Sequence, residues 1–201
     1  MLSILFSMFL FCLTGAIPPG PVNLIAASIG ANAGFYKALP HVTGASVSYS
    51  AIVALMGASL QGILLSYPQI THFLQFAGAS YLLYLSARIA TTKPVLKQQS
   101  PQVHIAGMMQ GVLSQSLNPK AWLVAMSGVS LFVTAGGQHS SLLLLVFCSI
   151  SGVVCFFSVA TWAALGKLIG KWLSHHAYQV MFNRSMACLL AATVVSMLYA
   201  A

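Results

Sequence analysis

The sequence contains no aspartate and no glutamate, and only 4% of its 201 residues are charged. In a water-soluble domain about a quarter of the residues are charged, so this chain cannot maintain a soluble surface. The lack of carboxylates also excludes an acid/base carboxylate pair, a Ser-His-Asp triad and acidic ligands for calcium or magnesium. We therefore expect a membrane protein that is not an enzyme, has no catalytic residues and needs no cofactor.

The cysteines and the positive charges exclude further classes. The four cysteines lie singly in apolar stretches, without the spacing of a metal site or a redox pair, at Cys12, Cys148, Cys155 and Cys188. We expect them to be apolar fillers and predict no metal site. The net charge of +8 is spread between apolar stretches, which is not the pattern of a nucleic-acid-binding patch. The expected partners are the lipid bilayer and a small molecule, and the sequence leaves open whether the protein is a homo-oligomer.

Apolar residues are abundant: they make up 59% of the chain, and the mean hydropathy is +0.91. An α-helix needs about 20 mostly apolar residues to cross a bilayer. Such segments are predicted at roughly 2–33, 41–65, 70–90, 104–134, 141–166 and 179–200. We therefore expect an all-α integral membrane protein with six transmembrane helices, forming a single domain over residues 1–201.

The basic residues predict the orientation of these spans. Seven of the eight cations fall in the first, third and fifth connections, at Lys37, Arg88, Lys93, Lys97, Lys167, Lys171 and Arg184. Cytoplasmic connections of membrane proteins carry an excess of Lys and Arg. The odd connections are thus predicted to be cytoplasmic, including a polar linker at about 91–104. With six spans, both termini are predicted to be periplasmic.

The first and fourth segments each contain a helix breaker near the middle. The first has the run PPGP at 18–21, and the fourth has Asn118 and Pro119. Proline removes a backbone donor and clashes with the preceding helical turn. Each segment has about 31 residues, which is longer than a ~30 Å hydrocarbon core requires. We predict that both helices are broken at these positions.

The two breaks resemble each other in the sequence that follows. With a shift of 99 residues, LIAAS at 24–28 aligns with LVAMS at 123–127. Halves of three spans, about 1–95 and 104–201, would run in opposite directions across the membrane. Many secondary transporters are inverted repeats with paired broken helices, and they bind substrate where the breaks meet. The sequence therefore predicts a 3+3 inverted repeat and alternating access.

Several motifs carry a family resemblance: IPPGPVN at 17–23, FAGASYLLYLSARIA at 76–90, SLNPKAW at 116–122, and a second span framed by Gly44 and Gly57. In this order and spacing they resemble the lysine exporter and homoserine/threonine resistance (LysE/RhtB) translocators of bacteria. The resemblance covers nearly the whole chain. It implies export of amino acids or close derivatives through the cell inner membrane, driven by the proton motive force.

One stretch departs from many members of that family. Several branches carry an acidic residue in the second span, where this chain has Ser48 and Tyr49. In this respect it is similar to the cysteine and O-acetylserine exporters. A carboxylate-based proton relay is therefore excluded, and a small neutral amino acid is favoured as substrate over a dibasic one.

The zwitterion of an amino acid needs donors for its carboxylate and acceptors for its ammonium group. A half-helix that begins at Pro21 or Pro119 offers free N–H groups, and Lys120 would add a full charge. Backbone carbonyls and neutral side chains must meet the ammonium group. The substrate-binding candidates are Pro19, Gly20, Pro21, Asn23, Tyr81, Gln110, Gln115, Asn118, Pro119 and Lys120.

Each candidate has another reading. The asparagines are equally suited to capping unwound backbone, and the glutamines to bonding between helices. Tyr81 suits packing or an interfacial anchor, and Lys120 suits a helix end from which its ammonium reaches water.

Histidines are the side chains here that titrate near neutral pH. His41, at the start of the second span, is the candidate for proton coupling, with an interfacial ring as the alternative. The substrate's own proton and Lys120 remain other possible means of proton coupling.

Two further functions stay open: a heavy-metal-ion exporter, suggested by the pair His175-His176, and a thiol-redox carrier in which Cys12 and Cys155 meet.

Overall fold

The structure, a computed structural model, describes residues 2–60, 66, 68–91, 102–133, 140–172 and 176–199. Within these residues every regular element is a helix and none is a β-strand, so the expected all-α class is confirmed. The described elements are α1 (Leu2–Ala16), α2 (Pro21–Ala33), α3 (Phe35–Leu55), the π-helix η1 (Met56–Leu60), α5 (Pro68–Ala90), α6 (Gln102–Ser116), α7 (Pro119–Phe132), α8 (Ser140–Trp172) and α9 (His176–Tyr199).

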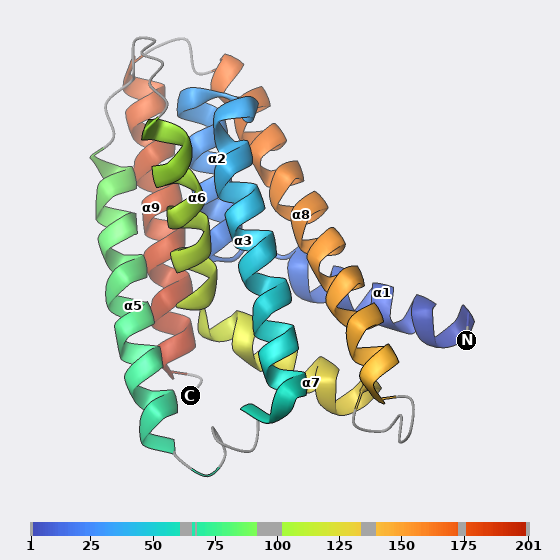
Figure 1. Ribbon diagram of the computed structural model, residues 1–201. Coiled ribbons are helices and arrows are strands. Elements are labelled where there is room, and N and C mark those ends of the chain that lie inside the picture. Colours follow the sequence, from blue (N-terminus) through green and yellow to red (C-terminus); the bar gives the residue numbers. More distant parts are fainter. Residues whose placement is uncertain are drawn as a thin grey trace.

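Most helices run roughly along one axis, and the chain reverses direction from each to the next (Figure 1). They are α2, α3, α5, α6, α8 and α9, whereas α1 and α7 lie across this axis. The ends of α2, α5 and α8 therefore gather at the same end of the bundle as the starts of α3, α6 and α9. Lys37 in the first turns of α3, Arg88 in the last turn of α5 and Lys167 near the end of α8 all belong to this end. Lys93 and Lys97 lie outside the described residues.

Both predicted breaks are confirmed. α1 ends at Ala16 and α2 begins at Pro21, and the two helices are bent by 65°. α6 ends at Ser116 and α7 begins at Pro119. Both prolines occupy the first helical turn, where the missing N–H group removes no intrahelical bond. Proline thus interrupts each predicted span and also occupies the first turn of the helix that follows the break.

The second span begins earlier than predicted. α3 starts at Phe35 rather than near residue 41, because the chain reverses after α2 at a single residue, Gly34. Its φ of 91° lies in a region that glycine adopts without strain. Lys37, which we expected in a connection, therefore lies in the helix.

The later boundaries also differ. α8 continues to Trp172, so the two lysines predicted for the fifth connection, Lys167 and Lys171, lie in its last turns. α6 begins at Gln102, within the linker predicted at about 91–104, of which residues 92–101 lie outside the described residues. Lysine and glutamine are good helix formers, so neither ends a helix when packing continues it.

Glycines allow two helix pairs to approach closely. A methyl group on Gly44 of α3 or on Gly111 of α6 would collide with a backbone carbonyl of the facing helix. Gly30 of α2 and Gly166 of α8 have the same relation to each other's helices. Small residues with this role are typical of helix contacts in membranes. The contacts α3–α6 and α2–α8 hold both broken segments against long helices.

Two helices are each long and apolar enough to cross a membrane, over Phe35–Ala58 and Ser140–Gly170. The bent pair α1–α2 adds a third if it counts as one span, among the residues that the structure describes. The six predicted spans are therefore not established by helix length and hydropathy.

The buried apolar residues form two clusters. The larger joins α1, α2, α3, α7 and α8 and contains Met8, Val42 and Phe147. The smaller joins α2, α5 and α9 around Leu82 and Leu190. α2 belongs to both clusters, so the start of this helix is fixed from two sides.

Candidate substrate site

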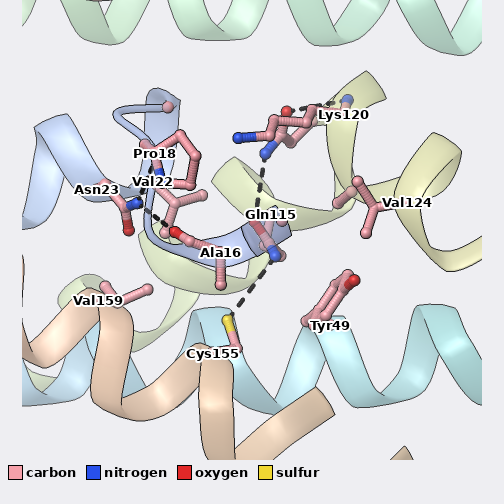
Figure 2. A pocket seen from close by; sticks show the side chains of 14 residues that line it. Ala16, Pro18, Val22, Asn23, Tyr49, Gln115, Lys120, Val124, Cys155 and Val159 are labelled. Atoms are coloured by element: carbon pink, nitrogen blue, oxygen red, sulfur yellow. Dashed lines mark hydrogen bonds between the residues drawn. The ribbon is translucent and has the colours of Figure 1, made fainter. Parts of the chain in front are cut away.

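The two helix breaks meet at one cavity (Figure 2). Its lining comes from the end of α1, the start of α2, the end of α6, the start of α7, and one face each of α3 and α8. The cavity measures about 50 Å³, which is room for a few water molecules. Breaks predicted from residues about a hundred positions apart thus share a single site.

The start of α2 makes one end of this cavity positive. Its N-cap, Gly20, has no side chain, so no side chain caps the helix. The N–H groups of Val22 and Asn23 lie in the first turn, where helix geometry provides no partner. The half-buried Lys120 reaches toward Gly20: a methyl group on that glycine would stand 3.9 Å from Nζ. A helix N-terminus beside an ammonium group is suited to bind an anion.

The start of α7 is occupied in a different way. Asn118 is its N-cap, and its Oδ1 accepts the backbone N–H of Lys120 at 3.2 Å. Asn118 Nδ2 donates to Gln115 Oε1 at 3.4 Å, and Gln115 Nε2 donates to the sulfur of Cys155 at 4.0 Å. Figure 2 draws this chain of bonds as dashed lines across the cavity. Of the two half-helices considered for the carboxylate, only α2 lacks a side-chain cap.

Asn23 bridges the unwound backbone of the first break. Its Nδ2 donates to the carbonyl oxygens of Ala16 at 2.8 Å and Pro18 at 3.0 Å. The Ala16 carbonyl also accepts the hydroxyl of Ser158 at 2.8 Å. The capping role considered for Asn23 is therefore present in the structure. Its Oδ1 points away from both carbonyls (Figure 2), and Asn23 is one of the residues that line the cavity.

Half of the ten predicted substrate-binding residues line the cavity: Gly20, Asn23, Gln115, Asn118 and Lys120. Pro21 and Pro119 start the two half-helices beside it, and Pro19 lies in the first break. Gln110 and Tyr81 are not among the lining residues. Tyr81 packs on the smaller apolar cluster, with its ring 6.4 Å from that of Tyr84.

His41 is buried beneath the start of α2. Its side chain has no exposed area, and Nε2 lies 3.3 Å from the carbonyl oxygen of Val22. Within the described part of the chain, Nδ1 has no hydrogen-bond partner. The ring is therefore enclosed by the protein, unlike the interfacial ring considered from the sequence. It touches the backbone of a residue that lines the cavity.

The family model for the LysE type translocator matches residues 13–201. The chain belongs to the LysE type translocator family. It is a transport protein of the multi-pass kind found in the inner membrane, and not an enzyme.

Two relatives align with this translocator over nearly its whole length. The cysteine/O-acetylserine efflux protein of Salmonella typhimurium is 26% identical over 196 residues, with 98% of each chain covered. The protein of the same description from Escherichia coli strain K12 is 25% identical over 197 residues, again covering 98% of each chain. No solved structure gives a significant match.

The translocator's cavity also contains residues that we did not predict. Tyr49 of α3 and Cys155 of α8 line it, together with Gly15, Val124 and Val159. In the sequence, the stretch containing Tyr49 stands out only by its lack of an acidic residue. A tyrosine or cysteine in an apolar segment is as compatible with packing as with a site, so the sequence offered no signal for either.

The metal and thiol readings find little support in the described residues. No group of three or more histidines and cysteines gathers there, and His175 lies outside them. All four cysteines are free thiols. Cys12 and Cys155 share the larger core cluster, but Cys12 bonds to Ser151 at 3.4 Å and Cys155 to Gln115.

Proposed function

We propose that this translocator exports small neutral amino acids or close derivatives across the bacterial inner membrane, as a secondary transporter driven by the proton motive force. The observation that carries the proposal is the meeting of both helix breaks at one cavity, with an uncapped helix start and an ammonium group at one end. The relatives described as cysteine/O-acetylserine efflux proteins support the same class of substrate.

The substrate carboxylate would bind at the start of α2, between its free N–H groups and Lys120. The substrate ammonium would bind Oδ1 of Asn23 and the Pro18 carbonyl, which has a second lone pair to offer. These acceptors are neutral. They suit one ammonium group, and a dibasic substrate would bring a second cation beside Lys120.

The finer architecture is part of the proposal. α2 has 13 residues and α6 has 15, lengths of roughly 20 and 22 Å that fall short of a ~30 Å hydrocarbon core. Each would complete a span only together with its crosswise partner, α1 or α7. This gives six spans in a 3+3 inverted arrangement. The end of the bundle with Lys37, Arg88 and Lys167 would face the cytoplasm, and both termini the periplasm.

Proton coupling would use His41. The Val22 carbonyl can only accept a hydrogen bond, so Nε2 must carry the hydrogen, and Nδ1 then holds the lone pair that binds a proton. A proton added there places a charge beneath the first turn of α2, beside the proposed carboxylate site. Substrate and proton would thus interact through a single turn of helix.

Export from proteoliposomes tests the proposal. The purified full-length protein is reconstituted into liposomes. The liposomes are loaded with labelled cysteine, O-acetylserine, threonine, homoserine, leucine or lysine, and a pH gradient is applied. We expect gradient-dependent export of the small neutral members and none of lysine. A flat result across the panel, or export that ignores the gradient, contradicts the proposal.

A further inference from the structure

Tyr49 is a buried tyrosine whose hydroxyl group has no hydrogen-bond partner in the part of the chain that the structure describes. The residue is 7% exposed and lines the cavity. No hydrogen bond to its hydroxyl is found among the described residues. Figure 2 shows the hydroxyl directed from α3 toward Val124. Buried tyrosine hydroxyls usually find a hydrogen-bond partner, so a ligand is the expected partner here.

The other side chains on this wall do not compete for a ligand's polar group. Val124 is apolar, and Gly15 has no side chain. Val159, on the Asn23 side of the cavity (Figure 2), is apolar too. Cys155 already accepts a hydrogen bond from Gln115. The wall is thus apolar with one free hydroxyl group. A site of this kind binds a small side chain and can form one hydrogen bond with it, which favours a polar side chain.

The opposite end of the cavity fixes the direction of the ligand. If the carboxylate binds at the start of α2 beside Lys120, the substrate side chain extends away from that end, toward α3 and α8. We propose that Tyr49 is a specificity-determining residue, which selects amino acids with a hydroxyl, thiol or ester group in the side chain over aliphatic ones of equal size. This inference rests on the proposed export function and names the substrate class of the same site.

The selectivity has a simple chemical basis. A phenol hydroxyl can donate and accept, so it pairs with a hydroxyl or thiol in either direction and donates to an ester carbonyl. An aliphatic side chain would displace water from the hydroxyl and leave it unsatisfied. The loss of such a hydrogen bond corresponds to a preference of about tenfold.

A matched pair of substrates tests the inference. L-Cysteine and L-2-aminobutyrate differ only by a thiol in place of a methyl group. Transport of both is measured with the wild type, Tyr49→Phe and Tyr84→Phe in proteoliposomes. Tyr84 is the control because it is exposed on α5 beside Arg88 and does not line the cavity.

We expect the wild type and Tyr84→Phe to prefer cysteine about tenfold in Vmax/KM. Tyr49→Phe should lose this preference through a higher KM for cysteine and a lower KM for 2-aminobutyrate, which no longer leaves a hydroxyl group unsatisfied. An equal loss for both substrates, or an unchanged preference, overturns the role of Tyr49. If Tyr49→Phe does not insert, competition between the two substrates on the wild type decides: no preference for cysteine overturns the inference. Absence of any amino-acid export by the wild type instead refutes the proposed function.

Discussion

Asn32 of α2 and Asn183 of α9 form a reciprocal amide pair. Asn32 Nδ2 donates to Asn183 Oδ1 at 2.6 Å, and Asn183 Nδ2 donates to Asn32 Oδ1 at 3.0 Å. Asn183 is almost completely buried. The pair joins the end of α2 to α9, at the opposite end of the helix from the cavity. It therefore anchors the helix whose start we assign to the substrate carboxylate.

Replacing one member of this pair should destabilise the protein. Asn183→Leu leaves Oδ1 of Asn32 without its donor and leaves Nδ2 of Asn32 only the Ser28 carbonyl, which costs about 1–3 kcal/mol of the free energy of unfolding. Thermal unfolding in detergent should show a Tm several degrees lower. The double variant Asn32→Leu/Asn183→Leu removes both amides and should cost less than the sum of the single variants. Additive losses would show that the two amides do not interact.

Removing the charge at the cavity should weaken substrate binding. Lys120→Met keeps most of the length of the side chain and loses the ammonium group that lies near Gly20. A hydrogen bond to a charged group contributes about 1.5–3 kcal/mol, so KM should rise by about tenfold or more. Lys167→Met is the control, because Lys167 stacks on Tyr36 with 5.7 Å between Nζ and the ring centre. Equal KM values in both variants would show that Lys120 does not bind substrate and is only a lysine at a helix end whose ammonium group reaches water.

Close packing of α3 and α6 should depend much more on Gly111 than on Gly107, which lies one turn earlier in α6. In Gly111→Ala the new methyl group collides with the His41 carbonyl. In Gly107→Ala it lies 3.5 Å from Cβ of Pro40, an ordinary contact. We expect Gly111→Ala to lose about 1–3 kcal/mol, whereas Gly107→Ala should be neutral or gain up to ~1 kcal/mol in helix propensity. Yield from membranes and Tm measure both, and similar values for the two variants would refute the close contact.

Coupling to protons should depend on His41. His41→Gln keeps a donor for the Val22 carbonyl and removes the nitrogen that binds a proton. Export driven by a pH gradient should be largely lost, because the proposed proton-binding site is gone. Exchange of labelled for unlabelled substrate without a gradient should continue, which separates coupling from binding. Unchanged gradient-driven export would assign coupling to Lys120 or to a proton on the substrate.

The sequence predicts the broken helices because their cause is local. A proline removes its own N–H group and blocks its own preceding turn, so PPGP and Asn118-Pro119 act wherever the chain goes. The start of α3 is less predictable, because one residue, Gly34, makes a turn that usually takes several polar residues. The end of α8 is less predictable for a similar reason: its lysines indicate a connection by their charge, but the helix continues through them.

The site was only half predictable because it depends on helix rotation and on distant contacts. Gln110 and Gln115 lie on the same helix, roughly 140° apart around its axis. The sequence does not indicate which of the two glutamines faces the site. In the structure Gln115 lines the cavity and Gln110 does not. Tyr49 and Cys155 reach it because glycines bring α3 and α8 close to the broken helices. No local pattern in either segment contains that information.

The two half-helix starts differ in one respect with a stereochemical consequence. A site made by two equal halves would accept a zwitterion in either direction. Here Asn118 caps α7, and α2 remains open, so the proposed carboxylate position exists only once. With the proposed ammonium contact at Oδ1 of Asn23 and the proposed side-chain contact at Tyr49, three different contacts would hold three substituents of one carbon atom. A mirror image could not make all three contacts, so under this proposal the cavity would distinguish L- from D-amino acids.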